Sequence, residues 1–376
     1  MTEAGIQPEA AAVARAALVR TIMAEGLLAD PAWRAAFEDV PRHLFVPSYW
    51  LPVRGGFERL SYGDPDPGVR ARWLAGAYAD TPLATRVRDG ALLSSSSQPS
   101  LMAQMLEVLE VRDGDRVLEI GTGTGFNAAL ISHRLGEERV TTVDLDREIT
   151  ESARDHLARA GYHPVVVRRD GARGCPSRAP YDRILATCAL RSVPGAWLEQ
   201  CRPGGLVVTP LATGLLALRV RGAAQAEGRF LNTSAYFVPL RAGGPASSKA
   251  SAPREAPKTG EPPNVPKAAE VRGAPGPVSP GKALPGASPQ PEDAEGVPQH
   301  LLRHEPFTFL LALTEGRLSP REAYELWQRA HHPERSRFGV TIRGAEQWAW
   351  LDDPDGPGAW PLGPAVQGAT WRPGPV

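Results

Sequence analysis

The chain has 376 residues, of which 42 are basic and 42 acidic, and its pI is about 7.1. This length favours two domains, and the balanced charge provides no overall field that would attract nucleic acid or a membrane surface. The three cysteines are scattered and the eight histidines lack ligand spacing, so we expect neither disulfides nor a bound metal. The sequence shows no signal-peptide pattern and no apolar run near the ~20 residues that span a membrane. These features predict a cytoplasmic protein without a membrane partner.

Two helices are expected first along the chain. Apolar residues recur at helical spacing from Ala10 to Leu28. Asp30-Pro31 then provides an N-cap followed by proline at the first helical position, which predicts a short helix to about Asp39. The oligomeric state is left open by the sequence.

Four consecutive serines, Ser94 to Ser97, precede the next helical pattern, Gln98–Glu110. Ser97 stands where an N-cap residue of that helix would stand, because a serine hydroxyl can accept a hydrogen bond from the first free N–H groups. The serines could equally form a flexible turn.

The segment Arg116–Asn127 is the most informative part of the chain. It predicts a buried strand to Ile120, a glycine-rich turn with Gly121 and Gly123, and a helix that begins near Gly125. Asp144 ends the next apolar strand about 20 residues further on, where a ribose-binding carboxylate is placed in nucleoside-binding crossovers.

Two details of this segment argue against a dinucleotide. The glycines alternate as G-x-G-x-G, whereas the dinucleotide motif is G-x-G-x-x-G. Glu119 lies two residues before the first glycine, where its carboxylate would repel a pyrophosphate but would suit a cationic ligand such as S-adenosylmethionine. The alternative is a glycine-rich turn that binds nothing.

Apolar strands and helices continue to alternate after this segment. This pattern predicts an α/β fold with a doubly wound, mostly parallel sheet of the Rossmann-like class, finished by antiparallel strands at Leu215–Val220 and Phe230–Leu240. Ligands of such sheets bind beyond the carboxyl ends of the strands. Gly121, Asp144, Asp170 and Thr187 are therefore expected around one crevice.

The composition changes sharply after this region. Thirteen of the 38 prolines fall between Pro245 and Pro298, and no aromatic residue lies between Phe237 and Phe307. Such a segment cannot bury enough apolar surface to fold. We therefore expect a catalytic domain over 1–242, a disordered linker over 243–298 and a small α+β accessory module over 299–376.

The accessory module has its own signals. The apolar run Phe307–Leu313 predicts a buried strand, and Glu346–Leu351 predicts another strand. Between them, Ser319-Pro320 predicts the start of a helix that continues through Gln328. Its five tryptophans could form a small core, which is the simpler interpretation, or a surface that docks a peptide.

Several motifs together resemble the protein-L-isoaspartate O-methyltransferase family over roughly residues 9–242. The glycine motif and Arg202-Pro-Gly-Gly205 are shared by many methyltransferases. More specific are Val40-Pro-Arg-His-Leu-Phe-Val-Pro47, Ser97-Gln-Pro99 and Phe237-Val-Pro-Leu240.

The resemblance implies S-adenosyl-L-methionine as the cofactor and assigns its contacts residue by residue. Glu119, Gly121, Thr122 and Gly123 would line its methionine and ribose portions, and Asp144 would bind the ribose hydroxyls. Asp170 and Gly171 would contact the edge of the adenine ring. Ser97 would be the catalytic serine beside the methyl-accepting carboxylate, with substrate-binding neighbours Ser95, Ser96 and Gln98.

The chain also departs from the family. Ser96 stands where the family usually has isoleucine, and the segment Pro52–Ala75 is longer than the family's connection. These changes flank the peptide-accepting face and leave isoaspartate selectivity open. The longer layout resembles a bacterial subgroup encoded with ribosomally made, modified peptides.

The predicted function is thus esterification of an aspartyl or isoaspartyl side-chain carboxylate in a protein or peptide, followed by succinimide formation. A modified ribosomal precursor peptide is the favoured substrate. The alternatives are a general isoaspartyl repair enzyme and, from another class, a cofactor-binding partner that docks a peptide without turning it over.

Overall fold

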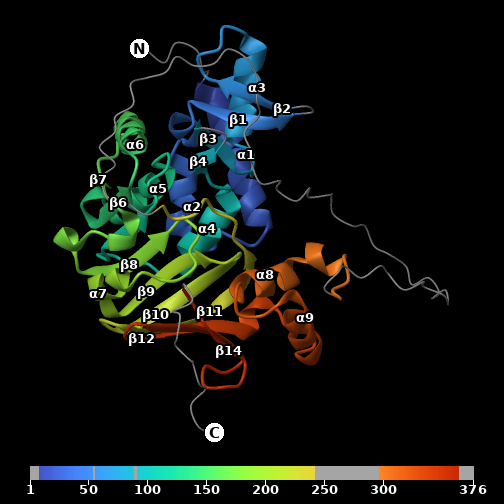
Figure 1. The fold of residues 1–376 in the computed structure, drawn as a ribbon. Helices are drawn as coiled ribbons and strands as arrows, with labels where there is room; N and C mark the ends of the chain where they lie inside the picture. Colours follow the sequence, from blue (N-terminus) through green and yellow to red (C-terminus); the bar gives the residue numbers. More distant parts are fainter. Residues whose placement is uncertain (1–7, 54–55, 89–90, 242–295, 364–376) are drawn as a thin grey trace, which may run out of the picture.

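The computed structural model describes residues 8–53, 56–88, 91–241 and 296–363. These residues form an α/β fold with one large mixed sheet of ten strands and one antiparallel sheet of four (Figure 1). In the described residues, no helix is both long enough and apolar enough to cross a membrane. Cys175, Cys188 and Cys201 are buried and free, as expected.

The parallel half of the large sheet matches the predicted doubly wound arrangement. Its strands run β7-β6-β5-β8-β9, and each neighbouring pair is parallel. Short turns connect these strands to helices on both faces. The elements are β5 (Val117–Ile120), α5 (Phe126–Leu135), β6 (Val140–Asp144), α6 (Arg147–Arg159), β7 (Val165–Arg168), β8 (Tyr181–Ala186), α7 (Gly195–Gln200) and β9 (Cys201–Leu211).

Helices cover the two faces of this sheet, and each face has its own apolar core. Val117, Val140 and Leu185 belong to the core shared with α1 (Pro8–Ala24), α2 (Pro31–Asp39), α4 (Pro99–Val108) and α5. Leu118 and Ile184 belong to the core on the α7 face. Successive side chains of a strand point to opposite faces, so burial on both faces produces the continuous apolar runs seen in the sequence.

The N-terminal region holds the second sheet, which the sequence did not reveal. Asp30 caps α2 as predicted, since its carboxylate accepts from the Ala32 N–H at 2.8 Å. The sheet follows in the order β2-β1-β3-β4, at the upper end of the view in Figure 1. Its elements are η1 (Arg42–Phe45), β1 (Ser48–Val53), β2 (Gly56–Ser61), α3 (Pro67–Ala77), β3 (Leu83–Arg88) and β4 (Ala91–Ser96).

The antiparallel half of the large sheet is longer than expected. It continues from β9 through β10 (Gly214–Gly222) and β11 (Gln225–Ser234). The strand predicted over Phe230–Leu240 is wrong in its second half, because the chain leaves the sheet after Ser234. Only an isolated bridge, Ala189 to Pro239, is formed there.

The segment after residue 296 completes this sheet. Strands β12 (Phe338–Arg343), β13 (Glu346–Leu351) and β14 (Ala359–Pro361) add to β11 in antiparallel register. The strand predicted over Phe307–Leu313 is wrong: these residues form α8 (Glu305–Leu313), with Pro306 in its first turn. A short apolar run has no decisive periodicity, so strand and buried helix look alike in the sequence.

Helix α9 (Pro320–Arg329) begins as predicted, with a capping box between Ser319 and Glu322. Trp327, Trp348, Trp350 and Trp360 are all buried, which supports the core interpretation of the tryptophans, and Trp371 lies outside the described residues. Helices α8 and α9 pack on the α7 face, in the same core as the strands (Figure 1). The residues after 296 therefore do not form a separately packed body.

The predicted boundaries of the three segments stay a prediction. Of the linker expected over 243–298, residues 243–295 lie outside the described residues. The remaining short helices are η2 (Glu137–Arg139), η3 (Gly171–Arg173), η4 (Pro176–Arg178), η5 (Leu301–Arg303) and η6 (Arg335–Arg337).

Candidate cofactor and acceptor site

A cleft lies at the carboxyl ends of β5, β6 and β8. Nine of the eleven predicted site residues line it, from two regions far apart in sequence: the cofactor residues Glu119, Gly121, Thr122, Gly123, Asp144 and Gly171, and the acceptor residues Ser95, Ser96 and Ser97.

The glycine turn has a backbone that side chains would not fit. Gly121 has a φ of +100° and Gly123 a φ of +54°. A Cβ on Gly121 would lie 2.8 Å from Thr187 Oγ1, so a side chain there would clash. A Cβ on Gly123 would be in ordinary contact with the Ser95 carbonyl oxygen, at 3.5 Å, so at this position it is the positive φ that favours glycine.

Glu119 is fully buried at the base of the cleft. Its carboxylate accepts from Asn127 Nδ2 at 2.8 Å and from Thr142 Oγ1 at 2.7 Å. Burial raises the pKa of Glu119 to about 7, although the two hydrogen bonds oppose this shift. A cation bound beside it would favour the ionised form.

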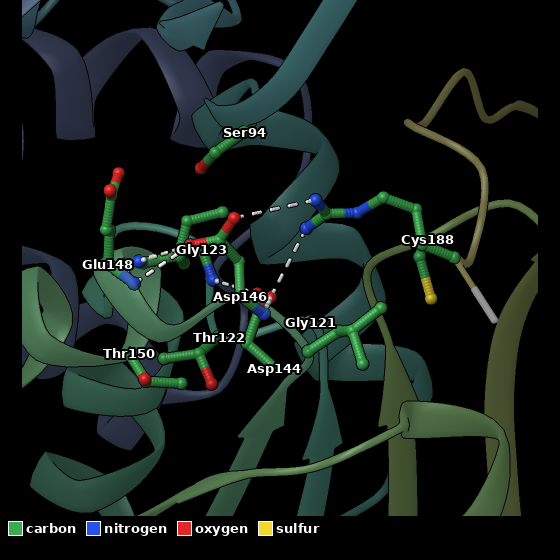
Figure 2. Close-up of polar contacts among 12 residues, drawn as sticks. Ser94, Gly121, Thr122, Gly123, Asp144, Asp146, Glu148, Thr150 and Cys188 are labelled. Carbon is green, nitrogen blue, oxygen red and sulfur yellow. Dashed lines mark hydrogen bonds and ion pairs between the residues drawn. The ribbon is translucent and has the colours of Figure 1, made fainter. Parts of the chain in front are cut away.

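Asp144 lies at the end of β6 and faces the turn. Figure 2 shows Asp144, Asp146, Gly121 and Gly123 gathered at the strand ends, with Ser94 approaching from another element. Asp144 accepts from the Gly123 N–H at 3.3 Å, and Arg241 Nη2 lies 3.4 Å from its second oxygen. Burial raises the pKa of Asp144, while the backbone donors and Arg241 lower it.

Ser97 is not the helix cap that its position suggested. The N-cap of α4 is Gln98, and its side chain makes no capping bond. Instead the Asp80 carboxylate accepts from the Ser100 N–H at 2.8 Å and from Gln98 Nε2 at 3.0 Å. Gln98 is thereby directed to Asp80 and does not line the cleft.

Asp170 also lies outside the lining of the cleft. Its side chain accepts from the Ala172 N–H and caps the short helix η3, while its neighbour Gly171 does line the cleft. Ile120 and Leu240 leave no room for a side chain at Gly171, because a Cβ there would lie 2.7 Å from Ile120 Cγ2.

Sequence reasoning missed several residues of the cleft. Asn127 lines it, and its Oδ1 atom is buried without a hydrogen-bond partner among the described residues. An orphaned acceptor beside Glu119 fits the ammonium group of a bound amino acid moiety. Arg241 and Cys188 line it as well. Asn127 is a polar residue in the first turn of a helix that follows a glycine turn, which was its only signal.

The chain resembles known proteins over the same region. Residues 69–243 match the family model of protein-L-isoaspartate(D-aspartate) O-methyltransferase. A protein-L-isoaspartate O-methyltransferase of Ignicoccus hospitalis is 37% identical over 196 residues, which cover 52% of this chain and 80% of that protein.

Two further similarities cover the same region. The protein-L-isoaspartate O-methyltransferase of Hyperthermus butylicus is 32% identical over 240 residues, covering 60% of this chain and 88% of that protein. A solved structure with the same name is 30% identical, covers 61% of this chain and 66% of its own, and superposes with a TM-score of 0.49.

Proposed function

This chain belongs to the protein-L-isoaspartate(D-aspartate) O-methyltransferase family, and on that premise we propose that it esterifies the free carboxylate of an aspartyl or isoaspartyl residue in a protein or peptide. It is an enzyme, a carboxyl methyltransferase, and S-adenosyl-L-methionine is its cofactor.

One observation carries this proposal: the serine strand and the glycine turn line the same cleft. The glycine turn, Glu119 and Asn127 offer backbone space, a carboxylate and a free acceptor, which suit a cationic nucleoside. The serines offer hydroxyl donors, which suit an anionic acceptor. A transfer reaction needs both partners held together.

The cofactor supplies an electrophilic methyl group when bound. The residues of the chain then have to bind and orient, because an acceptor carboxylate with a reference pKa near 4 is already ionised at pH 7. No general base is required. Ser97 holds one acceptor oxygen while the other faces the methyl donor, and this alignment lowers the barrier through proximity.

The ester product accounts for the second step. The methoxy group of the ester leaves far more readily than an oxygen of a carboxylate would, so the neighbouring backbone nitrogen attacks the ester carbonyl, closes a five-membered succinimide and releases methanol. No residue of the chain is needed for this closure. Hydrolysis of the succinimide would complete a repair cycle, whereas its retention would leave a modified peptide.

A narrower substrate is a modified ribosomal precursor peptide. One observation supports it: β1 and β2 join β3 and the serine strand β4 in a single sheet. The long segment after Pro52 is thereby connected to the acceptor side, where it can restrict which peptides enter. General isoaspartyl repair is the competing substrate class.

The test is incubation with S-adenosyl-L-methionine and a peptide panel, followed by mass spectrometry. The panel holds one isoaspartyl peptide, its aspartyl counterpart, and an aspartate-containing macrocyclic peptide. Methyl gain and later methanol loss on any of them supports the proposed activity, and the pattern among them decides the substrate class. Cofactor binding without methyl gain on any peptide contradicts it.

A further inference from the structure

Arg42 is a buried arginine directly behind the serine strand. Only 1% of it is exposed. Its guanidinium donates from Nη1 to the carbonyl oxygens of Ala77 at 2.8 Å and Ala79 at 3.0 Å. From Nη2 it donates to the Thr81 carbonyl at 3.2 Å, to Ser96 Oγ at 3.3 Å and to the Ser97 carbonyl at 3.2 Å.

These bonds fix both sides of Ser97. Arg42 holds the Ser97 carbonyl, while Asp80 holds the first turn of α4 through Ser100 and Gln98. Arg42 also binds the carbonyls of Ala79 and Thr81, which flank Asp80 in the chain. The guanidinium therefore couples the approach to β3 with the end of β4, and it shares with Asp80 the hydrogen bonds on the two sides of Ser97.

All five acceptors of Arg42 are uncharged oxygens. Asp80 acts on Arg42 only through space, since its own carboxylate binds the start of α4. Burial lowers the pKa of Arg42 to about 10, so the guanidinium stays charged at pH 7. Its charge adds a positive potential behind Ser96 and Ser97, which the nearby Asp80 carboxylate partly offsets, in a part of the protein where screening by solvent is weak.

We propose that Arg42 is a positioning residue for the acceptor: it aims Ser97 at the substrate carboxylate and supplies the positive potential that draws this carboxylate to β4. The inference rests on the proposed function. Arg42 itself makes no contact with the cleft, so its effect passes through Ser96 and Ser97. Cofactor affinity should not depend on it.

The experiment compares wild type, Arg42→Lys and Arg42→Met with an isoaspartyl peptide as acceptor. Lysine keeps the charge but cannot make five bonds in the guanidinium geometry. We expect kcat about 10- to 100-fold lower in both variants, because small misplacement of reacting groups has effects of this size. The acceptor KM should rise only in Arg42→Met. The Kd for S-adenosyl-L-methionine should match wild type in both.

Arg183 provides the matched control. It is also buried and donates to backbone carbonyls, those of Leu109 and Glu110, but it lies on β8 away from the serines. Arg183→Lys should lower Tm without lowering kcat. Wild-type kcat in folded Arg42→Lys, or an equal loss of kcat in Arg183→Lys, would overturn the inference.

A second pair of variants serves if Arg42→Lys does not fold. Ser96→Ala removes one bond to Arg42 and should lower kcat about threefold to tenfold, the size of one hydrogen bond. Ser132→Ala also removes a buried hydroxyl, in α5, and should leave kcat unchanged. Unchanged kcat in Ser96→Ala overturns the inference. Failure of the proposed function differs from both, since wild type itself would then methylate none of the peptides in the panel.

Discussion

Glu119 lines the cleft and carries a cost in stability. Its pKa of about 7 is raised by burial, so its protonated form is the one the fold prefers. A raised carboxyl pKa favours the folded state below the unfolded pKa, and this contribution is lost as pH rises through 7. Ionised Glu119 above that pH destabilises the ligand-free protein by up to about 3 kcal/mol.

Glu119→Gln should therefore raise Tm at pH 8 more than at pH 5. It should also weaken S-adenosyl-L-methionine binding at pH 8, because an uncharged amide cannot attract a cation. Thermal melts at both pH values and calorimetry at pH 8 measure the two effects. Equal Tm shifts at the two pH values would show that Glu119 is not the titrating group.

The role of Ser97 in orienting the acceptor can be tested separately from a role as helix cap, which the sequence alone left open. Because Gln98 is the N-cap of α4, Ser97→Ala should leave Tm close to wild type. If the hydroxyl orients the acceptor carboxylate, kcat should fall roughly tenfold or more, the value of a hydrogen bond to a charged group. Kinetics with the isoaspartyl peptide and cofactor calorimetry on one preparation provide the check. Normal kcat would remove Ser97 from the mechanism.

At the scale of an element, helix α4 depends on a cap from another segment. Asp80 replaces the missing cap of Gln98, so Asp80→Ala should cost about 1 kcal/mol of stability and should also lower kcat, since α4 begins next to Ser97. Asp66 caps α3 through its own side chain and is the control. Asp66→Ala should destabilise the protein similarly with kcat unchanged. A normal kcat in Asp80→Ala would show that capping of α4 by Asp80 does not influence the acceptor site.

The elements differ in how far the sequence could predict them. The strands from Val117 to Ala186 were predictable because burial on both faces gives them short, mainly apolar runs, and the glycine turn located the cleft. The strands β1 to β4 were not predictable, since buried positions are few in each strand and the sequence gives no clear alternation of apolar and polar residues. Asp80 and Arg42 act through contacts with residues far along the chain, which local patterns cannot show.

For the whole molecule, the residues after 296 act as part of the fold. Strand β12 pairs with β11 from Gln225 to Arg229, and Phe307, Phe309 and Phe338 share the core of the α7 face. A chain truncated after Arg241 should therefore expose an unpaired strand edge and an apolar face. We expect lower Tm and concentration-dependent aggregation, measured by thermal melts and light scattering.

The matched control shortens the chain without removing these residues. Deletion of 250–285 should leave Tm close to wild type, because the entropy of closing a connection depends only weakly on its length. A truncated chain that stays monomeric and binds S-adenosyl-L-methionine like wild type would instead support the division into independent segments.

The pairing of β11 with β12 also sets an order for events during synthesis. Ser234 ends β11 and Phe338 begins β12, so roughly a hundred residues must be translated between them, about 5 to 20 s at ribosomal rates. During that interval the growing chain carries an open strand edge on a nearly finished sheet. Neighbouring nascent chains on one messenger present the same edge, and β11 can pair between them. Yield of native protein should thus depend on translation speed and chaperone supply more than on the stability of the finished fold.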